Sequence, residues 1–387
     1  MEFDYFNRNT TDMLVNPPLY LTIGNVTSPK SNSADMSNSG FDLGINWNDK
    51  IGDFRYFVGV NASYNTHEVS KYKGALIYEA DPNTPDIWGN PTMRYTNLGD
   101  VMSTENSNRV VEGHLIGEHF LRKPYKGDGT YMNADGKPNP NGGPKDGMIR
   151  TKADLDWVRA MIAEGYSFNN KTVNTSAANI WYGDMIFADA NGDGRYGNDD
   201  DREFTGKSTT PKWTFGLNMS AEWKGFDMSM TWSGRLGSYH YINQRAANLN
   251  ILATVGDGVP FDAMTNYYMY DAIRAKEDPN YDPANDPNAN ISAKFPRLLS
   301  ATSTMVENTF YLYNTSYVKL KSLQIGYTLP KRLLAPAKIS NLRVFMSAEN
   351  LLAFYSKDFP VVDPELGGGF NTYPLTRMIS GGLSVTF

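Results

Sequence analysis

The chain has 387 residues, a formal net charge of -6, 13% aromatic residues and no Cys. The negative balance argues against nucleic acid as a partner, and the lack of Cys excludes disulfides, thiolate metal sites and thiol nucleophiles. No run of 18 apolar residues is present, so no transmembrane helix is expected, although a membrane protein built from strands would show none either.

The chain begins MEFDYFNRNTTDML, without the basic start and apolar segment of a signal peptide. An exported protein needs such a signal. The expectation is therefore that Met1 is not the natural start, unless the protein is not exported.

Alternation of apolar and polar residues is the dominant pattern along the chain, and it is typical of β-strands with two different faces. It appears first at 41–48 and 54–65. The clearest case is Trp213–Trp223, which Lys224-Gly225 joins to a second alternating segment, so that the two predict a hairpin.

The pattern continues to the C-terminus. In Tyr317–Leu329 the apolar positions change from even to odd numbers, which predicts a β-bulge near Lys321-Ser322. Further strands are expected at 342–349 and 379–387. Between the expected strands, residues 154–164 predict a helix with Thr151 as its N-cap, and 241–253 and 260–275 show weaker helical patterns.

Short and long connections alternate between the expected strands, as in outer-membrane barrels with brief periplasmic turns and large external loops. This parity places the C-terminus in the periplasm. Region 123–180 breaks the rule, because it should be a short turn. If 109–122 and 181–188 belong to an external excursion, the strand count falls from about ten to about eight.

Alternation alone does not separate a membrane barrel from a soluble sandwich, and soluble all-β domains are commoner. Matched aromatic residues favour the barrel: Trp213 and Trp223 lie on one face ten residues apart, and Phe54 and Tyr64 repeat that spacing. With a strand tilt near 40°, the spacing is roughly 26 Å along the membrane normal, close to the height of a barrel's apolar belt. These four residues are expected to form membrane girdles.

Two further features point the same way. The opposite face of the strands carries Lys, Arg, Asp, Glu and Asn, which would suit a hydrated lumen. The chain ends on Phe387 inside an alternating strand, and a terminal aromatic residue is an assembly signal in many outer-membrane proteins. The alternative is an ordinary edge strand, which would more often be protected by charge or Pro.

Nearly the whole chain resembles the C-terminal part of SusC/RagA-type TonB-dependent transporters. The similar segments, in the order of the family, are TTDML (10–14), MSNSGFDLGINW (36–47), VEGHLIGEHF (111–120), GDMIFADANGDGRYGNDDD (183–201), TPKWTFGLNMSAEWKGFDMSMTWSG (210–234), KFPRL (294–298), SYVKLKSLQIGYTLPKRLL (316–334), ISNLRVFMSAENLLAF (339–354) and GGLSVTF (381–387).

The resemblance implies an all-β, antiparallel transmembrane β-barrel segment of about 8–10 strands from a larger 22-stranded barrel, with long, partly helical external loops. Residues 1–387 would form one such unit, with the plug and the TonB-contacting segment upstream of Met1. Alone, the segment would expose two sheet edges and should not form a stable pore.

The function implied by this resemblance is energy-coupled import of a large nutrient, a glycan or a peptide, across the bacterial outer membrane. The implied partners are a SusD-like surface lipoprotein, the TonB complex through the missing N-terminal part, and membrane lipid. No residue is expected to carry catalysis. Two alternatives remain: a passive porin or adhesin barrel, and a soluble carbohydrate-binding or hydrolytic β-domain.

An acidic segment, DANGDGRYGNDD (189–200), matches an EF-hand-like loop. The ligands to calcium would be Asp189, Asn191, Asp193, the Arg195 carbonyl and Asp200. Asp200 departs from the usual bidentate Glu, and the alternative is a solvated turn. No other cofactor is expected.

Two other groups of residues were considered as sites. His114 and His119 are five apart, so a strand would place them on opposite faces, unable to share a metal ion. The aromatic loop residues Trp181, Tyr182, Tyr239 and Tyr241 could stack on sugars. The alternative for these four is loop packing or contact with a partner.

Overall fold

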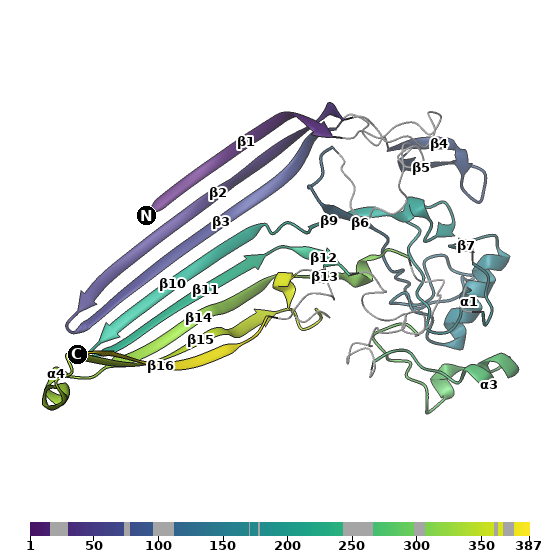
Figure 1. Ribbon diagram of the computed structural model, residues 1–387. Coiled ribbons are helices and arrows are strands. Elements are labelled where there is room, and N and C mark those ends of the chain that lie inside the picture. The colour runs from purple at the N-terminus through teal and green to yellow at the C-terminus, as the bar shows by residue number, and fades with distance from the viewer. Residues whose placement is uncertain are drawn as a thin grey trace.

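The computed structural model describes residues 1–15, 30–72, 78–95, 112–169, 171–176, 179–242, 266–297, 306–359, 363–366 and 375–387. The chain forms one large, curved antiparallel sheet, and a body built from the long loops stands at one end of it (Figure 1).

The sheet has eight strands whose spatial order follows their order in the chain. They are β1 (Glu2–Val15), β2 (Ser31–Ile51), β3 (Phe54–Tyr72), β10 (Trp213–Trp223), β11 (Phe226–Leu236), β14 (Tyr317–Thr328), β15 (Asn341–Tyr355) and β16 (Met378–Thr386). The expected all-β, antiparallel sheet is confirmed, with eight strands because 109–122 and 181–188 lie between β3 and β10. The described strands do not close into a barrel, since β1 and β16 each pair on one side only.

The predicted alternation of short and long connections is also confirmed. Gly52-Asp53 joins β2 to β3 and Lys224-Gly225 joins β10 to β11, while the long loops all lie at the opposite end (Figure 1). The positive φ angles of Gly52 (61°), Lys224 (45°) and Gly225 (90°) suit such tight hairpins. The third short connection carries α4 (Lys331–Leu334) and η6 (Ala335–Ala337), and the C-terminus ends beside it.

Two irregularities give the sheet its shape. Thr231 of β11 pairs with Ser322 and Trp232 with Leu320, so Lys321 is skipped and the predicted bulge is confirmed. The hairpin of β2 and β3 stays paired as far as Tyr72, eight residues beyond Tyr64. The hairpin therefore extends past Trp213, the first residue of β10, which pairs with Tyr64.

The loop body is made of small elements. They are β4 (Tyr78–Pro85), β5 (Pro91–Tyr95), β6 (Glu118–Leu121), α1 (Lys152–Ala163), β7 (Ser167–Phe168), β8 (Arg195–Tyr196), η2 (Asp199–Asp201), β9 (Glu203–Ser208), β12 (Tyr239–Tyr241), α3 (Ala272–Glu277), η4 (Pro283–Asn285), η5 (Thr309–Tyr311), β13 (Leu312–Asn314) and η7 (Pro364–Leu366). The strands pair as β4–β5, β6–β9, β7–β8 and β12–β13.

The predicted helix is confirmed as α1, and Thr151 caps it through a capping box with Asp154. The helical pattern at 260–275 is borne out only where α3 begins, and its residues 260–265 lie outside the described residues. Most of the pattern at 241–253 also lies outside them.

The hydrophobic core lies in the loop body rather than under the sheet. Its larger cluster is centred on α1, where Leu155, Trp157, Val158 and Met161 are at most 1% exposed. A smaller cluster joins β12 and β13 to Phe359.

The apolar face of the sheet, in contrast, is open. Trp47 and Phe354 are each 58% exposed. They are not buried between two stacked sheets, as a soluble sandwich would require. No helix in the described ranges is long and apolar enough to cross a membrane.

Candidate functional site

The open face of the sheet carries two rows of aromatic residues. In the upper row, near the loop body, Trp213 pairs across strands with Tyr64, which pairs with Phe41. The ring centres of Tyr64 and Trp213 are 4.8 Å apart, and those of Phe41 and Tyr64 are 5.7 Å apart.

The lower row lies near the short turns. Trp223 pairs with Phe54 on one side and with Phe226 on the other, and the rings of Phe226 and Tyr327 are 4.4 Å apart. The two aromatic pairs singled out from sequence are thus cross-strand neighbours at two levels of one sheet. Their place in a membrane girdle stays a prediction, as does the role of Phe387, which is 88% exposed.

The opposite face carries charged networks. Arg343 of β15 donates to both carboxylate oxygens of Asp227 on β11, at 2.9 and 2.5 Å, and to Gln324 of β14 at 3.1 Å. Such a bidentate pair suits a face that meets water or other polar groups rather than lipid.

Nearer the loop body, residues 363–366 are tied to this charged face. Lys319, which is only 2% exposed, pairs with Asp363 and, at 2.8 Å, with Glu365. Lys321, the residue at the bulge, reaches Glu365 at 2.6 Å, and Arg235 donates to the Pro364 carbonyl at 2.5 Å. Three cationic side chains of the strands, Arg235, Lys319 and Lys321, therefore hold residues 363–366 against the charged face of the sheet.

The acidic segment 189–201 forms a closed loop. The Asp189 carboxylate accepts from the amides of Gly192, Asp193 and Gly194 at 2.7–3.0 Å. The acid that closes the loop is Asp201, because η2 turns its carboxylate onto the amides of Ala190 and, at 2.7 Å, Gly197.

Asp201, and not Asp200, therefore closes the loop through these hydrogen bonds. It is 1% exposed, and burial, together with the charges of Asp189 and Asp193, raises its pKa to about 8. Within the described ranges, no group of three or more His, Asp or Glu is arranged to hold a metal ion. Calcium binding by Asp189, Asn191, Asp193, the Arg195 carbonyl and Asp200 stays a prediction, and the structure places the Asp201 carboxylate in the same loop.

Two of the four aromatic residues considered for sugar stacking are in the core. Trp181 is 7% and Tyr182 3% exposed. Both pack in the α1 cluster, where neither ring face is available to a ligand. Tyr241 packs against the smaller cluster, and Tyr239 lies under the Lys207 ammonium, 4.9 Å from its ring centre. Trp181, Tyr182 and Tyr241 therefore pack within the loop body, which is the alternative to a role in sugar stacking.

Folding brings together two histidines that the sequence keeps apart. His119 lies on β6 and is 2% exposed, with Nε2 3.1 Å from the Tyr239 carbonyl. Burial lowers the pKa of both His119 and His240 of β12, and the positive charge of Arg235 lowers that of His240 further. Both imidazoles are therefore neutral near pH 7.

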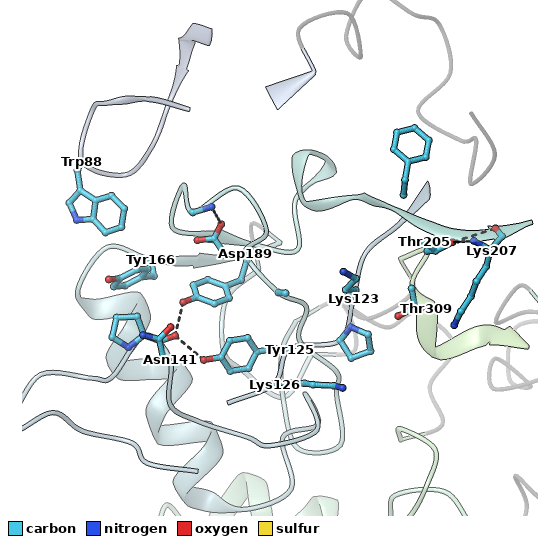
Figure 2. Close-up of a pocket in the computed structure, with 16 residues that line it drawn as sticks. Trp88, Lys123, Tyr125, Lys126, Asn141, Tyr166, Asp189, Thr205, Lys207 and Thr309 are labelled. Carbon is cyan, nitrogen blue, oxygen red and sulfur yellow. Dashed lines mark hydrogen bonds between the residues drawn. The ribbon is translucent and has the colours of Figure 1, made fainter. Parts of the chain in front are cut away.

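The structure also contains a cavity that the sequence did not reveal. It measures about 670 Å³ and lies in the loop body (Figure 2). Trp88 and Tyr166 line one end, Lys207 lies at the other end near Thr205 and Thr309, and Lys126 lies between the two ends beside Tyr125. These residues come from four separate segments, so no local motif could have indicated the cavity.

No protein-family model matches the chain. The chain is 25% identical, over its full length, to TonB-dependent receptor P3 of Formosa agariphila, of which it covers 32%. It is 25% identical over 218 residues to TonB-dependent receptor P26 of the same bacterium, covering 20% of that protein. Its fold matches the solved RagAB peptide transporter with a TM-score of 0.57 and 21% identity, over the whole chain and 33% of that structure.

The chain is thus similar over its whole length to part of a TonB-dependent receptor, and its fold is that of a segment of a RagA-type transporter. It spans about a third of the length of TonB-dependent receptor P3 and of the matched RagAB chain. Its location is the bacterial outer membrane, where TonB-dependent receptors reside. The matched proteins are receptors and a transporter rather than enzymes.

Proposed function

We propose that this receptor segment supplies part of the wall and the external loops of an energy-coupled importer of large nutrients. The observation that carries the proposal is the contrast between the two sheet faces. One face exposes apolar side chains between two aromatic rows, and the other holds charged networks such as Arg343–Asp227. A wall between lipid and a wet interior needs these two faces.

The loop body supports a role in recognition. It stands at one end of the sheet and has its own hydrophobic core, so it can present a defined surface rather than a mobile chain. In an importer this end would face the outside of the cell, where a SusD-like lipoprotein and a nutrient would meet it. The solved RagAB structures are described as a peptide transporter, which supports a peptide or another large nutrient as cargo.

The test compares three strains: the wild type, a deletion of this receptor gene and a deletion of tonB. Each is grown on peptide mixtures or on oligosaccharide mixtures as the sole nutrient source. An energy-coupled importer predicts the same growth defect in both deletions on one class of nutrient. Growth that needs the receptor but not tonB would instead support a passive porin.

The proposed partnership has a separate test. The tagged receptor is purified in mild detergent and its co-purifying proteins are identified. A SusD-like lipoprotein in roughly equal amount is the expected result. A receptor that remains alone, in a strain that imports normally, would remove the lipoprotein from the proposal.

A further inference from the structure

The cavity in the loop body has two chemically different ends (Figure 2). At one end Trp88, which is 59% exposed, stands nearly perpendicular to Tyr166, with ring centres 5.8 Å apart and planes at 83°. The two rings thus pack edge to face, and the exposed Trp88 ring presents a flat apolar surface. The apolar C–H face of a sugar ring can stack on such a surface.

The aromatic end is held in place by the acidic loop. The Ile87 amide donates to the Asp193 carbonyl at 3.0 Å, and Arg195 donates to the Pro85 carbonyl at 2.7 Å. A Cβ atom at Gly194 would lie only 2.6 Å from Ile87, so the β4–β5 hairpin approaches closely because position 194 is Gly. Trp88 is therefore positioned before a ligand arrives.

The middle of the cavity is also rigid. The Tyr125 and Tyr196 hydroxyl groups both donate to the Pro140 carbonyl, at 2.8 and 3.0 Å. Tyr125 also donates to the Gly142 carbonyl at 2.7 Å. Because these hydroxyl groups are already engaged, the walls offer ring surface, while Asn141 adds an amide that can donate and accept.

Beyond the aromatic end, the cavity is basic. Lys123 is neutralised by Glu203, 3.0 Å away. Lys126 and Lys207 have no carboxylate partner among the described residues, and Lys207 rests over the Tyr239 ring. The single acid in the lining, Asp189, already accepts three backbone amides. A ligand would therefore meet uncompensated positive charge there.

We infer that this cavity binds an acidic oligosaccharide, with a sugar ring on Trp88 and separate carboxylates of the same chain at Lys126 and at Lys207. The volume of about 670 Å³ falls within the range of ligand pockets. Thr205 and Thr309, near Lys207, add hydroxyl groups that can donate to or accept from a sugar. The inference deepens the proposed function by naming a nutrient class for a site on the outer loops.

The test measures binding to the purified receptor in detergent by isothermal titration calorimetry. The probes are trigalacturonate, neutral maltotriose and the acidic peptide Glu-Glu-Glu. Trigalacturonate should bind more tightly than either of the others, and its affinity should fall as salt rises. Equal or tighter binding of the peptide at this site would overturn the assignment to a saccharide.

Variants then locate the site. The double change Lys126→Gln and Lys207→Gln should weaken trigalacturonate binding about tenfold or more, and Trp88→Ala should weaken it to a similar degree. Lys276→Gln, on exposed α3 outside the cavity, is the control for loss of a surface lysine and should leave the affinity unchanged. Full affinity in both cavity variants would overturn the site. Because binding is measured without transport, loss of import in cells would not alter this result.

Discussion

Two tryptophans show how differently the sheet and the loop body use the same side chain. Trp223 ends a strand of the sheet and is 50% exposed, while Trp157 lies on α1 and is 1% exposed, with its Nε1 donating to the Asn139 carbonyl at 2.9 Å. In the loop body, water drives apolar groups inward and each buried polar atom needs a partner. In the sheet of the proposed barrel wall, lipid would be the solvent, so apolar groups would stay outside.

The comparison extends to charge. The loop body buries the Arg297–Asp184 pair, with side chains 5% and 0% exposed, inside its own packing. The sheet keeps its pairs on the face opposite the aromatic rows. The loop body thus encloses an ion pair in its interior, whereas the sheet keeps its ion pairs away from its exposed apolar face. Changes that alter one region should leave the other intact, and four predictions test this separation.

The largest expected effect is a pH dependence confined to the loop body. Asp201 has a pKa of about 8 when folded and 3.8 normally, so the folded state holds its proton more tightly. Its contribution to stability is greatest below pH 4, falls as the pH rises to about 8 and is constant above that, a change on the order of 5 kcal/mol. Melting curves of the loop body between pH 5 and 9 should show this loss.

Asp201→Asn should flatten that profile, because the amide cannot ionise. Asp135→Asn changes an exposed acid of the same body and should leave the profile as in the wild type. The same slope in Asp201→Asn as in the wild type would assign the pH dependence to another group.

The second prediction concerns the buried Arg297–Asp184 ion pair of the loop body. Arg297→Met leaves the Asp184 carboxylate buried without its bidentate partner, which should cost about 3–5 kcal/mol. Limited proteolysis should then cut the loops while the strands stay protected. Lys294→Met removes an exposed pair with Asp358 and should cost at most about 1 kcal/mol. Equal sensitivity of the two variants would contradict the buried role of Arg297.

The third prediction concerns the apolar face of the sheet. Leu217 lies midway along β10 between Val60 and Trp232 on the apolar face. Leu217→Arg should cost about 2–4 kcal/mol in a bilayer, because the charge would sit near the membrane midplane. Asn218→Arg, one residue on and on the charged face, is the matched control and should cost much less. Urea unfolding in lipid vesicles measures both, and the reverse order would mean that lipid meets the other face.

The smallest expected effect concerns calcium, which we propose for the acidic loop. A cation requires ionised carboxylates, so the effect should be measured at pH 8.5. At a calcium concentration 100 times the Kd, stability of the loop body should rise by about 2.7 kcal/mol. Asp189→Asn should abolish the rise. A melting temperature that does not respond to calcium would make the loop a purely structural turn.

The sheet could be predicted from sequence because its pattern is local. Alternation over eleven residues identifies Trp213–Trp223, and the change of phase in β14 indicates the bulge at Lys321. The loop body could not be predicted in this way. Its core uses the same aromatic residues that a binding site would, so the sequence did not show that Trp181 and Tyr182 are buried.

The candidate site was the least predictable part of the chain. The acidic motif was found, but a single turn of 3-10 helix decides that Asp201, not Asp200, closes it. Nothing in the sequence indicated the cavity, because Trp88, Lys126 and Lys207 come to line one cavity only through long-range packing. Spacing rules such as those used for the acidic loop cannot detect residues that are 81 positions apart, as Lys126 and Lys207 are.

The hairpin of β2 and β3 continues eight residues beyond the upper aromatic row at Tyr64. At the usual strand rise and tilt, that length is roughly 20 Å along the membrane normal, enough to clear the lipid head groups. In a receptor inserted in the membrane, this hairpin would therefore continue the sheet beyond the lipid on the flank of β2 and β3.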